Sequence, residues 1–535
     1  MRSLLLLLFA AASLAAPLLS GDTSHPDTSL YQAGERMTLT FGVSGATAPL
    51  TLQISVEDER ERVVARHELA VTPDAAGNWR GELEAPAERL GFYRVRARLS
   101  DGTTGPKLGT RAPGYLTYAV VPPARQRVLY PAEETFFGMQ GGFNPNLNVP
   151  ALLGVRWILG GYRWDRTEPE RAGQFDGRPP TPKPSNWQVD GEPWVTYPLP
   201  CIYNPPKWAV VPETVSYSTG TLSPAGEQAW AEYCRAVGRA FAAERPDLAR
   251  RLYQITWEPV YPWGFKGTDE DLIRIHEIAF EALHEADPRA WVIGPTGAGI
   301  SADDVEWNAR LLGKGLARYL DGLAIHPYHP MPPEANGLVD HVRALREVVR
   351  QTTGRDLPIY GTEQGWATGE DPARELAQAQ GLLRANLIMM GEGLQHNFAF
   401  YASDYHTELG YGYFYNLNPK MPWGTDKVAP KPVAPGYAAQ SLLLEGHRSA
   451  GAIEWLGETA LGYAYERGDS VVLALWDYGD QPREVSLPVG AEQVVVSDWM
   501  GNPRSLDCPG EVISTAKSGV PVKSPFQSKS AGILP

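Results

Sequence analysis

The alternation of hydrophobic and polar positions changes character twice along the chain. Between residues 23 and 121, apolar and polar residues alternate in short runs at 37–43, 50–56, 63–70, 93–99 and 115–121, separated by Gly, Pro and Asp. A period of two is typical of strands with one buried face. Several such strands at close spacing predict an N-terminal β-sandwich of the immunoglobulin-like kind over 23–121.

The middle of the chain, from 131 to 445, combines short apolar runs with longer helical stretches. The runs lie at 136–140, 155–159, 195–198, 252–257, 291–294, 322–326, 359–363 and 397–401. Helix start signals lie between them, at Ser223 before Pro224, at Thr268 three residues before Asp271, and at Asp371 before Pro372. Eight strands, most followed by a helix, predict a (β/α)8 TIM barrel. A doubly wound open sheet is the alternative, although no glycine-rich phosphate turn follows the first strand.

Period-two patterning returns between 450 and 515, in runs at 463–465, 471–476, 484–489, 494–499 and 512–514. This predicts a small C-terminal β-domain. Residues 516–535 are rich in Ser, Lys, Gly and Pro and have little apolar content, so we expect a loose tail.

The first twenty residues have the composition of a secretory signal peptide. A single Arg precedes the apolar run 4–9, and small residues follow it up to Ala15 and Ala16, after which cleavage is expected. A membrane anchor is the alternative, but the apolar run is shorter than the roughly 20 residues that a span needs, and Pro17 interrupts it. We therefore expect a secreted or periplasmic protein with no membrane insertion.

Composition excludes several function classes. A length of 535 residues predicts two to four domains, and a net charge of −14 argues against a nucleic-acid partner, because such binding rests on Lys and Arg. The three cysteines lack zinc or Fe–S spacing and allow one disulfide at most, with a Cys201–Cys234 pair left open. Twelve of the sixteen tryptophans fall between Trp157 and Trp423. A saccharide-binding groove would use such flat rings, but tryptophan is also an ordinary core residue.

Two glutamates close two of the expected barrel strands. Glu258 lies in Thr256-Trp257-Glu258-Pro259 at the end of the fourth strand, and Glu363 ends the seventh. Barrel enzymes carry their reactive groups at the carboxyl ends of the strands. Paired carboxylates there suit glycosidic cleavage, in which one protonates the leaving oxygen and the other attacks the anomeric carbon. The alternative is that each Glu caps a helix or pairs with an Arg.

Several short motifs have the order and spacing of a known clan. They are Phe137-Gly138-Met139-Gln140, Gly154-Val155-Arg156-Trp157, His326-Pro327-Tyr328 and Lys431-Pro432 followed by Tyr437. Together with the two glutamates, residues 131–445 resemble the retaining glycoside hydrolases of clan GH-A, closest to family 39 and related exopolysaccharide-cleaving enzymes.

The resemblance implies a role for each matching residue. Glu258 would be the acid/base and Glu363 the nucleophile, with carboxyl oxygens about 5–5.5 Å apart. Arg156 would lie beside Glu363 and keep it ionised, so that the pKa of Glu258 exceeds that of Glu363. His326 and Tyr328 would line the sugar pocket. No cofactor and no metal is implied, although a metal site at His326 and His329 is an alternative.

One residue departs from the clan pattern. Trp257 occupies the position where the clan usually has an Asn that bonds the sugar 2-hydroxyl. This implies a sugar modified at C2, a different hydrogen-bond donor, or lost activity. Further aromatic residues, Trp366, Tyr401 in the segment 398–415, and Trp423, are candidate sugar-stacking platforms, and each is equally well explained as core.

The sequence thus predicts a secreted retaining glycosidase that cleaves β-glycosidic bonds of a polysaccharide or oligosaccharide. Two other hypotheses remain. A catalytically silent carbohydrate-binding or matrix protein on the same scaffold would explain Trp257. A metal-dependent barrel hydrolase would need a His-rich first strand, which Phe137–Gln140 lacks.

Overall fold

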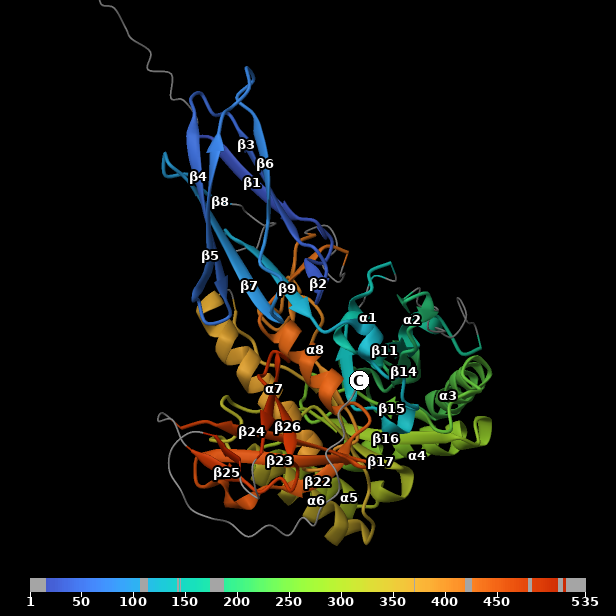
Figure 1. The fold of residues 1–535 in the computed structure, drawn as a ribbon. Helices are drawn as coiled ribbons and strands as arrows, with labels where there is room; N and C mark the ends of the chain where they lie inside the picture. Colours follow the sequence, from blue (N-terminus) through green and yellow to red (C-terminus); the bar gives the residue numbers. More distant parts are fainter. Residues whose placement is uncertain are drawn as a thin grey trace, which may run out of the picture.

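The computed structural model describes residues 16–105, 114–141, 144, 146–173, 187–369, 371–418, 426–479, 484–508 and 513–515. Its elements form an N-terminal group of strands, a central barrel and a C-terminal group of strands (Figure 1). The tail expected at 516–535 and the apolar run of the expected signal peptide lie outside the described residues.

The centre of the molecule is a closed barrel of eight parallel strands that are hydrogen-bonded in chain order. The strands are β10 (Phe137–Gln140), β11 (Trp157–Arg163), β14 (Tyr197–Tyr203), β15 (Arg251–Ile255), β16 (Ala290–Gly297), β17 (Gly322–Ile325), β18 (Ile359–Gln364) and β19 (Asn397–Ala399). Each overlaps one predicted apolar run, so the TIM barrel is confirmed. The open-sheet alternative is wrong, because β19 pairs back onto β10 at Phe137, Gly138 and Met139.

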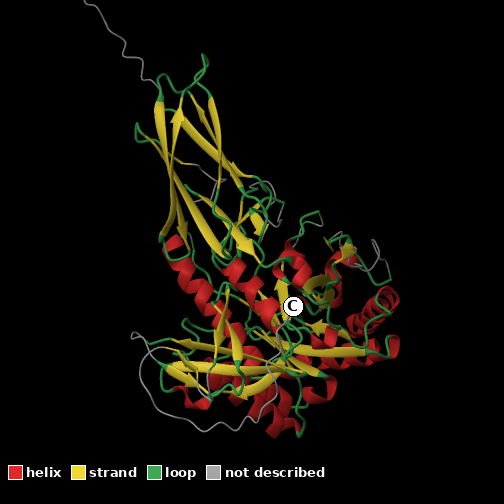
Figure 2. Ribbon diagram, viewed as in Figure 1, coloured by secondary structure: helices red, strands yellow, loops and turns green. Residues whose placement is uncertain are grey.

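Helices cover the outside of the barrel (Figure 2). They are α1 (Val149–Leu153), α2 (Trp164–Thr167), α3 (Pro224–Glu244), α4 (Asp269–Ala286), α5 (Ala302–Gly313), α6 (Leu338–Thr353), α7 (Glu375–Gly391) and α8 (Val433–Leu444). In the described part of the chain, none of these helices is both long and apolar enough for a membrane crossing.

The predicted helix start signals act as expected at two positions. The Ser223 side chain accepts a hydrogen bond from Gly226 N at the start of α3, and Thr268 and Asp271 form a reciprocal capping box at the start of α4. These bonds satisfy backbone N–H groups that the first helical turn leaves unpaired. Asp371 instead begins the short 3-10 turn Pro372–Arg374, and α7 follows it directly.

Two sheets build the N-terminal unit. One contains β1 (Leu18–Thr23), β3 (Thr38–Ser44) and β6 (Trp79–Glu84). The other contains β2 (Leu30–Gln32), β9 (Leu116–Val121), β7 (Gly91–Leu99), β4 (Leu50–Asp58) and β5 (Val63–Val71), with β8 (Thr104–Gly105) on β7. Phe41 of one sheet and Val56 and Val95 of the other belong to one buried cluster, so the two sheets pack face to face. An immunoglobulin-like identity for this unit stays a prediction.

Strand β1 begins close to the predicted cleavage site of the signal peptide. Its residues Leu18–Thr23 pair with β3, and Leu19 is buried in the core between the sheets. The signal peptide itself stays a prediction. Cleavage after Ala15 or Ala16 would leave β1 intact.

The C-terminal group forms three small sheets. They are β22 (Arg448–Ala452), β23 (Ala460–Arg467) and β24 (Ser470–Asp477), then β25 (Val485–Leu487) with β28 (Ile513–Thr515), and β26 (Gln493–Ser497) with β27 (Pro503–Asp507). Strand β23 packs on α7, where Tyr463 and Tyr465 donate hydrogen bonds to Glu392 and to the Leu387 carbonyl.

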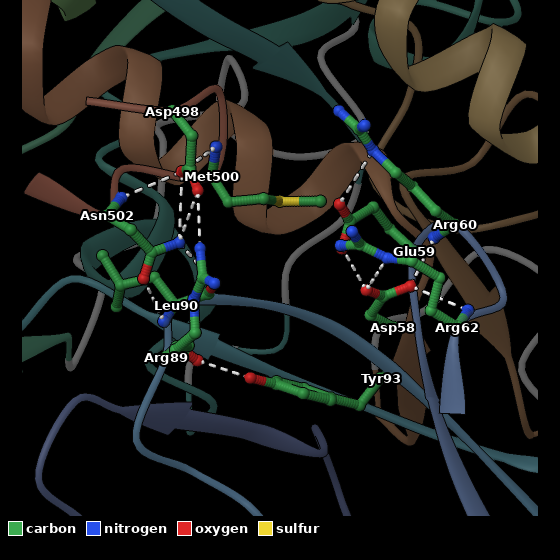
Figure 3. Close-up of polar contacts among 10 residues, drawn as sticks. All are labelled: Asp58, Glu59, Arg60, Arg62, Arg89, Leu90, Tyr93, Asp498, Met500 and Asn502. Atoms are coloured by element: carbon green, nitrogen blue, oxygen red, sulfur yellow. Dashed lines mark hydrogen bonds and ion pairs between the residues drawn. The ribbon is translucent and has the colours of Figure 1, made fainter. Parts of the chain in front are cut away.

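Short polar contacts join the N-terminal unit to the rest of the molecule (Figure 3). Asn502 accepts a hydrogen bond from Leu90 N and donates one to Leu90 O, both at 2.9 Å, and Arg89 forms an ion pair with Asp498 at 3.1 Å. Near the barrel, Tyr115 bonds Tyr415. The N-terminal unit therefore contacts both the C-terminal strands and a loop segment of the barrel.

Candidate active site

Glu258 lies on a short, unusually shaped segment after β15. Thr256 and Glu258 both have positive φ angles, 67° and 45°, in the left-handed region that non-glycine residues rarely occupy. Neighbouring strands hold this backbone in place, since Thr256 N donates to Ile202 O and its hydroxyl donates to Pro295 O. Such strain costs about 1–3 kcal/mol per residue and is typical of functional sites. It directs the Glu258 side chain at the carboxyl end of the barrel.

Glu363 lies within β18 and is only 5% exposed. The pairing of β18 with β19 shifts register between Gly361 and Gln364, which sets Glu363 apart from the regular ladder. Tyr328 donates a 2.6 Å hydrogen bond to its Oε1 atom, whereas the buried Oε2 atom has no hydrogen-bond partner in the described structure. One carboxylate oxygen is therefore held and the other is free to react.

His326 links the two glutamates. It follows β17 directly and is fully buried, with its Nδ1 atom 2.6 Å from Oε1 of Glu258 and 3.8 Å from Oε2 of Glu363. One atom from each of these three side chains lies within 4.8 Å of the others. The two carboxyl groups therefore lie close to each other at the carboxyl end of the barrel.

Burial is the main influence on protonation at this site. It raises the pKa of Glu363 to about 7, with a further increase from the charge of Glu258 that His326 and Tyr328 only partly oppose. Burial alone would lower the pKa of His326, but the charges of Glu363 and Glu258 and the hydrogen bond to Glu258 raise it. Burial and the charge of Glu363 also raise the pKa of Tyr328, so its phenol stays a proton donor.

The predicted place of Arg156 is wrong. Arg156 precedes β11, so it lies at the amino end of the strands, whereas the two glutamates lie at the carboxyl end. Its buried guanidinium donates to the carbonyls of Val195 and Tyr130 and to the hydroxyl of Tyr197. The expectation that a cation holds the pKa of Glu363 low therefore fails, and desolvation raises that pKa instead.

Trp257 precedes Glu258 in the chain and packs against His326. Its ring packs against Tyr203 with centroids 5.6 Å apart and edge-on against His326 at 5.0 Å. Its backbone N–H donates to the hydroxyl of Ser218 at 2.8 Å. The indole therefore occupies a fixed place between the loop after β14 and the acid–base cluster.

Two of the remaining aromatic candidates pack against residues other than the two glutamates. Trp366 contacts Arg374, whose guanidinium lies 5.0 Å from the ring centroid, and its carbonyl accepts from Gln378. Tyr401 is buried and packs on Phe400 with centroids 4.4 Å apart. Trp423 lies outside the described residues.

Three further residues influence the site without having been singled out from the sequence. Burial and the charge of Glu258 raise the pKa of Glu408. The charge of Glu408 in turn raises the pKa of Glu363. Tyr411 packs on Phe400 at the same mouth. Ser218 supports Trp257. Glu408 and Tyr411 fall in the aromatic segment 398–415, whose composition could have indicated their place at the site. Ser218 is a single serine in a loop, and no sequence pattern marks it.

Glu258, His326 and Glu363 are also a candidate metal-ligand set. The sequence analysis missed it, because the carboxylates come from other strands than His326. The geometry fits a proton better than a metal, since His326 Nδ1 and Glu258 Oε1 are 2.6 Å apart. Two ligands on a tetrahedral zinc at normal bond lengths lie about 3.3 Å apart.

The structure also answers the question of a disulfide. Cys201, Cys234 and Cys508 are all free and buried, so no Cys201–Cys234 disulfide is present.

Comparison with solved structures shows the fold of the chain. No family model and no curated protein sequence matches the chain. Among solved structures, a family 39 glycoside hydrolase from the gut symbiont Bacteroides cellulosilyticus matches with a TM-score of 0.61 and 16% identity, over 91% of this chain and 96% of that one. A GH39 enzyme from Xanthomonas axonopodis pv. citri matches with a TM-score of 0.45 and 16% identity, over 67% and 75% of the two chains. A GH30 endoxylanase from Clostridium papyrosolvens matches with a TM-score of 0.48 and 12% identity, over 72% and 94%. The chain thus has, over nearly its whole length, the fold of a solved family 39 glycoside hydrolase.

Proposed function

We propose that this protein is a retaining glycoside hydrolase, exported from the cell, that cleaves β-glycosidic bonds of a polysaccharide or oligosaccharide. The observation that carries the proposal is the pair of buried glutamates at the carboxyl end of the barrel, with oxygens within 4.8 Å of each other. Carboxyl groups this close suit direct attack by one of them, whereas inverting glycosidases hold theirs farther apart to fit an attacking water beside the sugar.

The contacts of each glutamate favour Glu363 as the nucleophile. Its Oε2 atom has no hydrogen-bond partner, and Tyr328 fixes Oε1 and so orients the carboxylate. In the first step, Oε2 forms an ester bond to the anomeric carbon while the bond to the leaving oxygen breaks. Glu258 donates its proton to that oxygen.

In the second step, Glu258 works as the base. It takes a proton from water as the water oxygen attacks the anomeric carbon and the ester bond to Glu363 breaks. His326 is hydrogen-bonded to Glu258 and close to Glu363. We infer that it positions the acid/base and holds the positive charge that lets Glu363 ionise despite burial.

Trp257 has a place in this mechanism. Its ring lies against His326, next to Glu258, where the clan usually has a side chain that bonds the sugar 2-hydroxyl. An indole offers an apolar face and one N–H donor. We propose that the site tolerates changes at C2 of the sugar better than the clan pattern would.

The decisive experiment is a hydrolysis panel of β-linked polysaccharides and aryl glycosides, with Glu258→Gln and Glu363→Gln proteins as controls. Turnover that both substitutions abolish or strongly reduce supports the proposal. Binding without turnover in the unmodified protein would instead support the silent carbohydrate-binding alternative.

A metal-dependent hydrolase is the second candidate, because Glu258, His326 and Glu363 could ligate one ion. Overnight dialysis against EDTA distinguishes it. We expect glycosidase activity to survive chelation unchanged; loss on chelation and recovery with Zn²⁺ or Mn²⁺ would favour the metal mechanism.

A further inference from the structure

Three aromatic side chains are strongly exposed at the carboxyl end of the barrel. Tyr217 is 51% exposed, Tyr261 44% and Trp263 46%, whereas every other Tyr, Trp and Phe of the described residues is buried or half-buried. The three also lie together: Trp263 contacts Tyr217 with ring centroids 5.8 Å apart and stacks on Tyr261 at 6.0 Å with 25° between the planes. We call these three residues the aromatic platform.

The aromatic platform is continuous with the active site through ring contacts. Tyr217 lies 6.4 Å from Tyr203, Tyr203 lies 5.6 Å from Trp257, and Trp257 lies 5.0 Å from His326, all between centroids. A path of aromatic rings therefore leads from the side chain that bonds Glu258 to exposed rings at the surface.

Backbone hydrogen bonds fix the platform relative to Glu258. Tyr217 N donates to Trp263 O at 2.8 Å, and Thr219 N donates to Gly264 O at 3.1 Å, which joins the two loops. Gly264 packs so closely on the Glu258 backbone that a Cβ there would lie 2.2 Å from the Glu258 carbonyl oxygen. Ser218, between Tyr217 and Thr219, accepts from Trp257 N. The exposed rings are thus held by the same segment that carries the proposed acid/base.

A cavity of about 440 Å³ adjoins Tyr261. Trp307 lines it together with the polar side chains of Asp303 and Glu306 on α5. Carboxylates accept hydrogen bonds from hydroxyl groups, and binding sites for small polar ligands combine such groups with apolar walls. The cavity therefore offers hydroxyl partners next to the apolar rings.

We propose that the aromatic platform binds further sugar units of a chain substrate, on the leaving-group side of the cleaved bond. This inference rests on the proposed function. The C–H face of a pyranose ring is apolar and flat enough to cover an exposed aromatic ring, and it removes that ring from water. Large exposed aromatic clusters are uncommon on soluble proteins unless they bind something.

The leaving-group side follows from which glutamate the platform adjoins. The proton donor contacts the glycosidic oxygen, beyond which the leaving sugars continue, and the platform is attached to the Glu258 segment rather than to β18. Its use for several sugars also identifies the substrate class as an oligosaccharide or polysaccharide rather than an aryl glycoside or a disaccharide.

The test is direct binding, which does not depend on turnover. The Glu363→Gln protein is titrated by calorimetry with β-linked gluco-, xylo- and N-acetylglucosamine oligosaccharides of two to six units. We expect affinity to rise with length in at least one series. Replacing Trp263 by Ala should lower the ratio of hexasaccharide to disaccharide affinity about tenfold, as hot-spot aromatic residues do. Trp263→Phe should restore part of it, and Trp79→Ala, a half-buried tryptophan in the N-terminal unit, should leave it unchanged.

Two results would overturn the inference: no length-dependent binding in any series, or an equal loss of affinity for short and long chains in Trp263→Ala. The side of binding is tested by hydrolysis of an activated glycoside with oligosaccharide acceptors present. In Trp263→Ala, the ratio of glycosyl transferred to the acceptor to glycosyl transferred to water should fall. An unchanged ratio would contradict the placement of the platform on the leaving-group side. If length-dependent binding is seen but Glu258→Gln leaves hydrolysis intact, the proposed catalytic roles fail while the platform stands.

Discussion

At the scale of single residues, the two glutamates have distinct surroundings and should respond differently to substitution. Glu258→Gln removes the proposed proton donor, so activity should fall about 100- to 10,000-fold on substrates with poor leaving groups and much less on activated aryl glycosides. Added azide should restore part of the turnover. Steady-state rates on both substrate types check this, and an equal loss on both would argue against acid catalysis by Glu258.

Glu363 should carry the covalent intermediate, because its free Oε2 atom is the available nucleophile. An activated 2-deoxy-2-fluoro glycoside should label the peptide that contains Thr362-Glu363-Gln364, with the mass of one sugar, as read by mass spectrometry. A label on another carboxylate would make the assignment wrong. If Trp257 occupies the place proposed for it beside C2 of the sugar, labelling should depend little on the C2 substituent.

The raised pKa of Glu363 also predicts a pH-dependent change in stability. Its folded-state pKa of about 7 lies above the ordinary value of 4.5, so the folded protein binds the proton more tightly, and stability falls as pH rises from about 4.5 to 7. Glu363→Gln removes this cost, which is of the order of 3 kcal/mol. The variant should melt above the unmodified protein at pH 8 and near it at pH 4.5.

Glu445 is the matched control for that experiment. It is fully buried, burial raises its pKa to about 7, and it accepts from Phe136 N at the amino end of the barrel. Glu445→Gln should show the same pH dependence of melting temperature with activity retained. A pH-independent difference for Glu363→Gln would show that desolvation does not dominate at this site.

At the scale of elements, the loop after β14 positions the acid/base segment through Ser218. Ser218→Ala leaves the buried N–H of Trp257 without its partner, which costs about 1–3 kcal/mol. We expect kcat to fall more than KM rises, with Ser218→Thr restoring kcat. Ser441, which is buried and bonds Leu153 O on the far side of the barrel, provides the control: Ser441→Ala should lose stability but not kcat. A similar kcat loss in both would indicate a purely structural effect.

At the scale of the whole molecule, Asn502 and Arg89 couple the N-terminal unit to the C-terminal strands (Figure 3). Asn502→Ala removes two hydrogen bonds to Leu90, so we expect about 1–2 kcal/mol less stability and faster hydrogen exchange at the Leu90 amide. Activity should be unchanged. The exposed Arg80–Glu82 pair lies within one strand, and Arg80→Ala should have almost no effect. Unchanged exchange in Asn502→Ala would mean that this contact does not couple the units.

The sequence by itself determined the barrel and most residues of the candidate site. The period and length of the hydrophobic runs indicate which segments are buried strands. All eight barrel strands were therefore predicted with ends within a few residues of those observed. Because parallel strands all end at one edge of the barrel, Glu258, Glu363, His326 and Tyr328 could be placed at one mouth before any coordinates were known.

The tertiary structure alone decided how these residues act together. Ser218 and Trp257 are 39 positions apart, and Glu258 and His326 are 68 apart, so no local pattern encodes their contacts. Arg156 lies at the start of its strand and Glu363 near the end of another, so the two residues are at opposite ends of the barrel. The raised pKa of Glu363 and the exposure of Trp263 likewise depend on which distant side chains exclude water from one position and leave it at another. Burial is a property of the assembled chain, whereas periodicity is a property of each segment.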